Sequence, residues 1–505
     1  MSDPKQNGHE KINFDELPPP YEWTVLLYMA GDNNLSEECV YALMEIKDAL
    51  ADNPRLKVVA QFDPAGRRAE TKRYELHPHP HSLEHDARKT RWRTKETDTG
   101  EPSNLLDFLR WGMPTFRAEH YMVVLVGHGT GTDDDFLRDE NPPNSLSIFE
   151  LETIVKKMRD DGYTIDILGM DTCLMSMAEV CYQLLEHKVG YMVASEGFAP
   201  NTGWPYASII DELSKNIPVD GTMSQADPRW LAQMIVDKYR EFYEPYINGG
   251  ISVDQSVLEV ALIDDVQKAM SDLVGVLLKE FKDGQLNYGS EKQNALILAH
   301  WETQSYNGEA FVDLYDFCKL LKARYKEPEV DDKCQKVIDA ITKLVVRSVV
   351  SGAAFQFSYG LSISFPWATL SPDYINLSFP KQTKWTDFLK LYHFKTQRKG
   401  RGEQIAGGVN HQAVLSTPGE VPPVRATVPT NKGRNGEVQS MRNPPSEEFV
   451  GTWPIEEPHV PDKRPAVTAV HWNNGEKQKG TSVTTASKKK SGQVDKGVAK
   501  AARKT

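Results

Sequence analysis

The stretch Ile165-Asp-Ile-Leu-Gly-Met-Asp-Thr-Cys173 decides the fold of this 505-residue chain. Its first six residues form a short, mainly apolar run with β-branched side chains, which is typical of a strand buried on both faces. A helical pattern follows from Ser176 to Leu185. Open α/β sheets carry their chemistry at the carboxyl ends of such strands. The stretch therefore predicts an α/β sheet with Cys173 at its reactive edge, where the helix N-terminus would favour the thiolate.

A second buried strand is predicted from Tyr121 to Val126, and it leads into the turn Gly127-His-Gly-Thr-Gly131. A histidine at the end of one strand and a cysteine at the end of another can meet in space. His128 and Cys173 are the minimum for cysteine nucleophilic catalysis, because the imidazole transfers protons and the thiolate attacks. Either residue alone is more often structural, so their shared position at strand ends is what favours catalysis.

The glycines around His128 allow two interpretations. A glycine-rich turn can hold phosphate, but no Gly-Lys-Ser/Thr ending follows, and three aspartates come directly after the turn. Close approach of two backbones is the better use. The backbone amide of Gly129, together with that of Cys173, could then point at a developing oxyanion.

Charge is unevenly distributed along the chain. The net charge is −12 in total. Residues 398–505 hold 18 Lys and Arg against 10 Asp and Glu, which gives +8 and leaves −20 for the rest. An acidic body argues against nucleic-acid binding, except weakly through the basic tail, since phosphate contacts need clustered cations. Such a body would attract basic substrates.

The cysteines and the apolar runs bear on the compartment. Five cysteines are present, an odd number without any CxxC pair, which favours a reducing compartment. Residues 1–20 are polar and lack the apolar segment of a signal peptide. No apolar run reaches the roughly 18 residues that span a membrane. We therefore expect a soluble, cytoplasmic protein without membrane partners.

Strand and helix patterns alternate in the first 205 residues. A strand at 23–29, helical spacing at 35–50 and a strand at 56–62 imply a parallel pair with a right-handed crossover. Helices are also expected at 103–117 and 147–159, and a further strand at 189–194. Later helices are expected at 227–243, 256–282, 291–303, 311–323, 333–350 and 385–394, with late strands at 353–357 and 361–365. From 398 onward apolar periodicity ends, which predicts disorder.

Several motifs accompany these elements. They are TVLLYMAGDNNL (24–35), HGTG (128–131), DTCLM (171–175), SEGFAPNTGWPY (195–206), FVDLYDF (311–317) and GLSISFP (360–366). In combination they resemble the clostripain family of cysteine peptidases over about residues 22–395. That family is similar in fold to caspases, gingipains and legumain.

The resemblance implies a caspase-like, mostly parallel β-sheet flanked by helices. Together with the composition, it predicts a polar leader at 1–20, a catalytic core at 21–205, a mainly helical C-terminal subdomain that completes the peptidase at 206–397 and a disordered basic tail at 398–505.

The resemblance also implies roles for individual residues. His128 and Cys173 would form the catalytic dyad, and the Gly129 and Cys173 amides would hold the oxyanion. Asp171 would line the S1 pocket and bind a P1 Arg or Lys; the alternative is that it caps the following helix. Glu196 is a second candidate for that pocket.

Members of the family are often made as proenzymes that are cut between the His and Cys strands after a basic residue. Arg138 lies there, in a long acidic loop, and is the expected processing site. Some members depend on calcium, and the loop is rich in the oxygen ligands that calcium prefers. The candidate calcium ligands are Asp133, Asp134, Asp135 and Asp139.

The resemblance, taken together with the polar N-terminus, implies an intracellular cysteine endopeptidase that cleaves proteins after Arg or Lys, within a regulatory or defence-linked cascade. No organic cofactor is required. The expected partners are protein or peptide substrates with a basic P1 residue, and an upstream activating protease. The alternative is a catalytically dormant caspase-like scaffold that binds partners. The presence of both His128 and Cys173 argues against it.

Overall fold

The computed structural model describes most of the chain between residues 21 and 396. The described ranges are 21–67, 69–78, 82–88, 97–132, 136–220 and 222–396, with two short strands at 430–432 and 438–440. These two strands, β14 (Thr430–Lys432) and β15 (Val438–Ser440), pair in antiparallel fashion within the segment expected to be disordered. The predicted leader at 1–20 and the rest of the tail lie outside the described residues.

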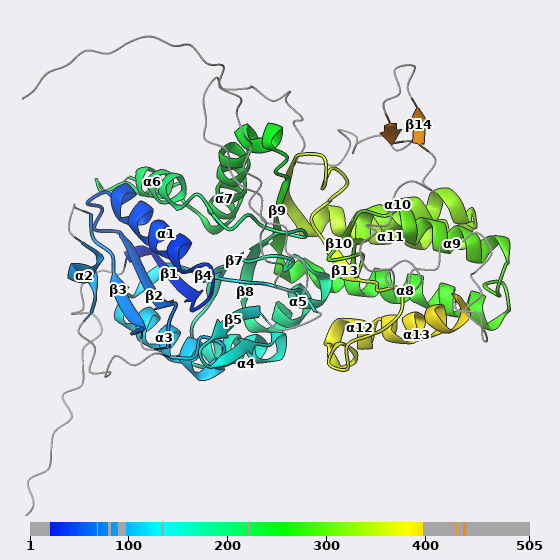
Figure 1. Cartoon of the computed structure of the whole chain (residues 1–505), viewed down its shortest axis with the longest axis horizontal. Coiled ribbons are helices and arrows are strands. Elements are labelled where there is room, and N and C mark those ends of the chain that lie inside the picture. Colours follow the sequence, from blue (N-terminus) through cyan, green and yellow to red (C-terminus); the bar gives the residue numbers. More distant parts are fainter. Residues whose placement is uncertain are drawn as a thin grey trace, which may run out of the picture. The chain divides into compact units, whose positions relative to one another are not determined.

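An eight-stranded sheet forms the centre of the fold (Figure 1), in the order β12-β9-β8-β7-β4-β1-β2-β3. Its five middle strands are parallel, which confirms the predicted α/β class. They are β1 (Tyr21–Gly31), β2 (Leu56–Pro64), β4 (Ala118–Val126), β7 (Ile165–Asp171) and β8 (Val189–Ala194). The antiparallel edge strands are β3 (Lys72–Glu75), β9 (Val253–Glu259) and β12 (Val345–Ser351).

Helices cover both faces of the sheet, as a parallel sheet requires. Alternate side chains of β1 enter two separate cores: Leu26 and Tyr28 enter one, and Val25 and Leu27 the other. One face carries α3 (Pro102–Thr115), α4 (Ile148–Asp160) and α5 (Ala178–Leu184). The other face carries α1 (Ser36–Ala49), α6 (Tyr206–Asn216) and α7 (Pro228–Tyr243) (Figure 1).

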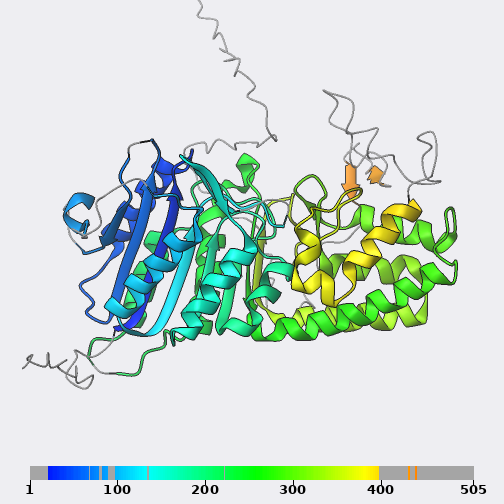
Figure 2. The ribbon, with the colours of Figure 1, turned by 90° about the horizontal axis from the view of Figure 1, so that it is seen from below.

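The later helices lie beyond the β9 and β12 edge of the sheet (Figure 2) and share a continuous core with α3, α4 and α5. They are α8 (Ile263–Lys282), α9 (Glu291–Glu302), α10 (Leu314–Tyr325), α11 (Pro328–Leu344), α12 (Ser378–Gln382) and α13 (Trp385–Thr396). Beside them is a small antiparallel sheet of β10 (Ser305–Tyr306), β11 (Phe311–Asp313) and β13 (Ser362–Ser364).

Smaller elements complete the described chain. Helix α2 (Leu83–Asp86) follows β3, and β5 (Phe136–Glu140) forms a hairpin with β6 (Pro143–Leu146). The 3-10 helices are η2 (Leu185–His187), η3 (Glu244–Gly249), η4 (Val260–Leu262) and η5 (Tyr374–Asn376).

Four predictions of secondary structure are wrong. Residues 256–259, 311–313 and 345–350 were expected to be helical but belong to β9, β11 and β12. Short apolar runs fit both periodicities, and here the open edge of β8 provides a partner for strand pairing. The expected strand at 353–357 is a turn that follows Gly352, whose φ is +87°.

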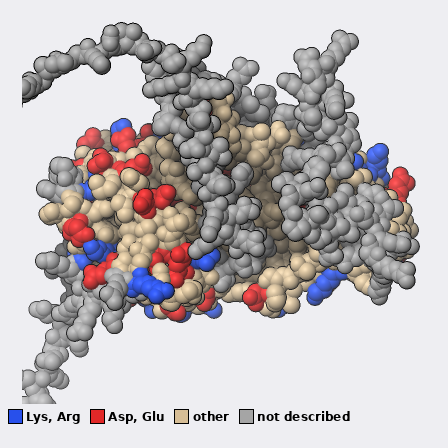
Figure 3. All heavy atoms as spheres, in the orientation of Figure 1, with Lys and Arg blue, Asp and Glu red and all other residues tan. Residues whose placement is uncertain are grey.

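Hydropathy was expected to exclude a membrane span, and the acidic charge of the body was expected to argue against nucleic-acid binding. Within the described ranges, no helix combines the length and apolar character that crossing a membrane requires. On the face seen in Figure 3, acidic side chains are spread over the part built from the early strands and helices, with basic side chains between them.

Candidate active site

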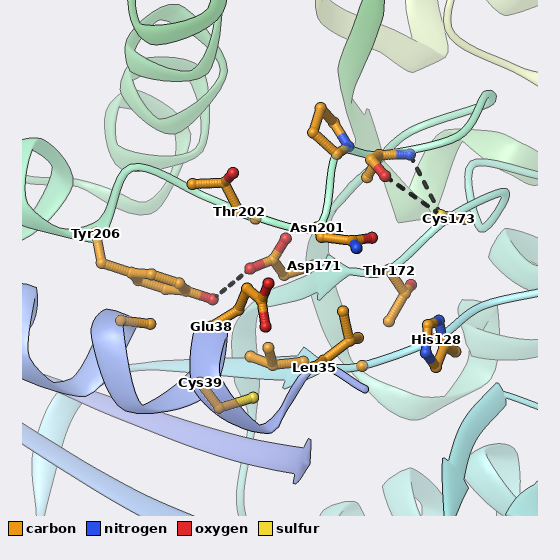
Figure 4. Close-up of a pocket in the computed structure, with 16 residues that line it drawn as sticks. Leu35, Glu38, Cys39, His128, Asp171, Thr172, Cys173, Asn201, Thr202 and Tyr206 are labelled. Carbon is orange, nitrogen blue, oxygen red and sulfur yellow. Dashed lines mark hydrogen bonds between the residues drawn. The ribbon is translucent and has the colours of Figure 1, made fainter. Parts of the chain in front are cut away.

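The predicted catalytic residues meet at the carboxyl edge of β4 and β7. Val126 pairs with Asp171 in the parallel register, so His128 and Cys173 each follow a paired position by two residues. The amide of Gly127 donates to the Asp171 carbonyl at 3.3 Å and extends the pairing past the strand ends. His128, Asp171 and Cys173 line a single pocket (Figure 4).

The Cys173 thiol is half-buried against the loop that follows β8. Its Sγ accepts a hydrogen bond from the Ala199 amide at 3.3 Å and lies 3.7 Å from the Ala199 carbonyl oxygen. Burial raises the pKa of the Cys173 thiol to about 11, and the nearby charges of Asp171 and Asp254 add to this. Burial therefore opposes the thiolate that was expected here. Helix α5 begins only at Ala178, too far along the chain for its N-terminus to stabilise the sulfur.

The His128 imidazole is held by an amide. Its Nε2 lies 2.8 Å from Oδ1 of Asn34, in the turn after β1. Because an amide oxygen only accepts hydrogen bonds, this contact places a proton on Nε2 and leaves Nδ1 as the basic nitrogen. Burial lowers the pKa of His128, and the positive charge of Arg138 lowers it further. A neutral imidazole beside a protonated thiol is suited to general-base activation of the sulfur.

The Gly129 backbone lies directly against that of Cys173. A Cβ at Gly129 would be 2.2 Å from the Cys173 carbonyl oxygen and 3.1 Å from the Cys173 amide nitrogen. Real Cβ atoms do not come this close, so only glycine fits. The predicted close approach of the two backbones is confirmed, and it brings the two candidate oxyanion amides together.

The chain turns sharply immediately after the nucleophile. Leu174 has a φ of +63°, a left-handed conformation that costs a non-glycine residue about 1–2 kcal/mol. The turn is held in place because the Leu174 amide donates to the Gly197 carbonyl at 3.0 Å and the Leu174 side chain is fully buried. Ser176 continues the link through its amide, which donates to the Ser195 carbonyl at 2.9 Å.

Asp171 lies at the base of the pocket. One carboxylate oxygen, Oδ2, accepts hydrogen bonds from the Tyr206 hydroxyl at 2.8 Å and the Trp204 amide at 3.1 Å (Figure 4 shows the first). Burial raises the pKa of Asp171 to about 6, against these hydrogen bonds, which lower it. The capping alternative is wrong, because the N-cap of α5 is Met177.

Glu196 does not line this pocket, so its prediction as a second pocket residue is corrected. It is fully buried, and its Oε2 accepts from the Gly360 amide at 2.6 Å. Asp254 on β9 holds the same loop, because its carboxylate accepts from the amides of Glu196 at 2.6 Å and Gly197 at 2.9 Å. Burial and the charges of Asp313 and Asp254 raise the pKa of Glu196 well above its usual range. We call Glu196, Asp254 and Asp313 the buried carboxylate cluster.

Arg138 lies in strand β5, where a loop was expected. Its side chain is exposed, while its carbonyl oxygen accepts from Nδ2 of Asn33 at 2.8 Å. The adjacent Leu137 amide donates to the His128 carbonyl at 2.9 Å. The hairpin is therefore attached to the catalytic turn, and Arg138 is part of that attachment.

The predicted calcium ligands differ in what can be said of them. Asp133, Asp134 and Asp135 lie outside the described residues. The Asp139 carboxylate is buried and accepts hydrogen bonds from Thr99 and from the Asn141 amide, so its oxygens have protein partners. Among the residues that the structure describes, no three side chains of His, Cys, Asp or Glu gather as a metal site.

Two residues of the site were missed from the sequence: Asn34, which contacts His128, and Glu38, which lines the pocket. Asn34 belongs to the turn Ala-Gly-Asp-Asn-Asn, whose place at a strand end was a usable signal. Glu38 is in the first turn of α1 and gave no signal, because acidic residues are common at helix N-termini. The pocket is lined by Leu35, Glu38, Cys39, Ala42, Val126, Gly127, His128, Asp171, Thr172, Cys173, Ala199, Pro200, Asn201, Thr202, Gly203 and Tyr206.

Comparison with known proteins agrees with this site. The family profile described as "Clostripain family" matches residues 27–393. Clostripain from Hathewaya histolytica is 22% identical over 396 residues, covering 68% of this chain and 74% of that protein.

A solved structure with a TM-score above 0.5 shares the fold. A secreted C11 cysteine protease from Bacteroides thetaiotaomicron, bound to an irreversible peptide inhibitor, has a TM-score of 0.54 at 16% identity and covers 72% of this chain and 99% of its own. An inactive zymogen C11 protease from Parabacteroides distasonis has a TM-score of 0.49 at 18% identity, over 75% of this chain and all of its own. Since the family profile spans most of the sequence and its catalytic motifs meet in one pocket, this chain belongs to the clostripain family of cysteine peptidases.

Proposed function

We propose that this peptidase is an endopeptidase that cleaves polypeptides after Arg or Lys. The observation that supports this specificity is the Asp171 carboxylate, which lines the pocket beside the Cys173 thiol. Its Oδ1 has no hydrogen bond among the described residues, so that oxygen is left for a ligand. A carboxylate at the base of a narrow pocket attracts a guanidinium or an ammonium group.

The proposed reaction gives each group a role. Nδ1 of His128 takes the proton of the Cys173 thiol as the sulfur attacks the scissile carbonyl carbon. The carbonyl π electrons move to oxygen, and the Gly129 and Cys173 amides stabilise the resulting oxyanion. When the oxyanion collapses, the C–N bond breaks and His128 gives its proton to the leaving amine.

The second half of the reaction restores the enzyme. His128 removes a proton from a water molecule, whose oxygen attacks the thioester carbon. The C–S bond breaks, and the proton returns from the imidazole to the Cys173 sulfur. No organic cofactor takes part in either half.

We further propose that the chain is a proenzyme cut after Arg138. The exposed side chain lies between the His128 and Cys173 strand ends, as processing requires. Cleavage there would break the β5–β6 hairpin, which is attached to the His128 carbonyl through Leu137.

Intact mass and peptide turnover test these proposals together. Wild type and Cys173→Ala are assayed on fluorogenic peptides ending in Arg, Lys or Asp, in calcium and in EDTA. We expect only wild type to be cut at Arg138 and to turn over the Arg and Lys peptides. Equal turnover of the Asp peptide would refute the specificity. Arg138→Gln should block the cut, whereas Arg159→Gln in α4 should not.

A further inference from the structure

A second carboxylate shares the pocket with Asp171. Glu38 projects from the first turn of α1, is half-buried and lines the pocket near Asp171 (Figure 4). The Cys39 thiol also lines the pocket, and the charges of both acids act on it. Burial raises the pKa of Cys39 to about 12, and the negative charges of Asp171 and Glu38 contribute to that rise.

Among the residues that the structure describes, no cation neutralises either acid. The described lining of the pocket contains no Lys or Arg. Within the described part of the chain, no hydrogen bond or ion pair engages the Glu38 carboxylate, and Asp171 uses only Oδ2. Two acidic side chains therefore line one pocket that has no Lys or Arg in its described lining, and such a pocket is suited to a positive ligand.

The helix N-terminus is the competing explanation for an acid at this position. Both Glu37 and Glu38 are in the first turn of α1, where the helix dipole favours negative charge. Glu37 is exposed and does not line the pocket. Both glutamates therefore interact with the helix dipole, but only Glu38 lines the pocket. Glu37 is thus a matched control for Glu38.

We propose that Glu38 is a second specificity-determining residue, which binds the P1 side chain together with Asp171 and makes the enzyme prefer Arg to Lys. The inference rests on the proposed cleavage after basic residues. A guanidinium has five N–H donors in a planar fork, so it can reach a carboxylate at the base and another at the wall of the pocket. An ammonium is a compact point charge and gains less from the second carboxylate.

The test compares Glu38→Gln with Glu37→Gln on paired peptides that differ only in a P1 Arg or Lys. Both substitutions keep the side-chain shape and remove one charge. We expect Glu38→Gln to lower kcat/KM about 10-fold for the Arg peptide and about 2–3-fold for the Lys peptide. The change should come mainly from a higher KM, and the larger effect corresponds to the loss of one charge-assisted contact. Glu37→Gln should change both values less than about 2-fold, as for an exposed charge. Glu38→Asp should restore part of the Arg preference.

Each outcome decides between specific ideas. If Glu38→Gln and Glu37→Gln behave alike, or if Glu38→Gln lowers both peptides equally, the role of Glu38 is refuted while cleavage after basic residues stands. If wild type turns over neither basic peptide but cleaves a neutral one, both proposals fall. Thermal unfolding of each variant establishes that the fold is intact. Titration with an irreversible inhibitor gives the concentration of active sites, to which each rate is normalised.

Discussion

Replacing Gly129 by alanine tests the oxyanion arrangement most directly. The new Cβ would lie 2.2 Å from the Cys173 carbonyl oxygen, whereas ordinary contact begins at 3.4 Å. The two backbones must therefore separate by roughly 1 Å, and a misplacement of about 1 Å near the reacting atoms costs about 100-fold in rate. Loss of one oxyanion donor costs about 100- to 1,000-fold in kcat. We expect kcat to fall by this amount.

The Michaelis constant should change much less, because the Asp171 carboxylate is held by Trp204 and Tyr206 and not by the Gly129 turn. The substitution also overpacks a buried contact, which costs about 1–3 kcal/mol of stability. The assay is steady-state turnover of an Arg peptide by processed enzyme, with thermal unfolding measured in parallel.

A glycine in open space provides the control. A Cβ added at Gly249 would meet nothing within 4 Å, and the backbone there has no positive φ, so Gly249→Ala should retain wild-type kcat. If folded Gly129→Ala kept more than one-tenth of wild-type kcat, the two amides could not be the main stabilisers of the oxyanion.

Three further predictions concern titration and orientation. Asn34→Ala should lower kcat about 10-fold, because the His128 imidazole loses the contact that orients it. Asn34→Asp should restore activity and move the acid limb of the kcat/KM profile to higher pH, because a carboxylate raises the pKa of His128. An unchanged pH profile would contradict this. Because burial raises the pKa of Asp171 to about 6, its carboxylate is protonated below that pH, so KM for an Arg peptide should rise as pH falls from 7 to 5; a constant KM would exclude Asp171 as the P1 ligand. Burial raises the pKa of Asp313 to about 8 and that of Asp254 to about 6, so the folded state keeps protons that the unfolded state releases. Stability should therefore fall as pH rises from about 4 to about 8, and Cys173→Ala should unfold at a lower temperature at pH 8 than at pH 6; the opposite order would refute the buried cluster as the source.

The sequence predicted that His128 and Cys173 would lie at one edge of the sheet because their signals are local. His128 and Cys173 each follow a buried apolar strand directly, and parallel strands deliver their ends to one edge. The pKa of the Cys173 thiol could not be predicted from the neighbouring sequence. It depends on burial by the Ala199 loop and on the charge of Asp254, a residue 81 positions later.

The remaining differences also arise from long-range pairing. Glu196 has the composition expected of a pocket acid, yet its side chain turns to Gly360, which only the three-dimensional fold brings near. Arg138 was expected in a loop because prolines and acids surround it, but Phe136 pairs with Leu146 and makes a hairpin. The strands β9 and β12 were hidden because their apolar runs also fit a helix.

The late position of the buried carboxylate cluster in the sequence determines when the active site can form during translation. The loop beside the nucleophile depends on Asp254 and on the Gly360 amide, and Ser176 bonds to the Gly360 carbonyl at 2.8 Å. Both partners are translated long after Cys173. A nascent chain that has exposed His128 and Cys173 from the ribosome therefore still lacks the contacts that shape its active site. The loop beside Cys173 can therefore take its final form only after residue 360 has been translated.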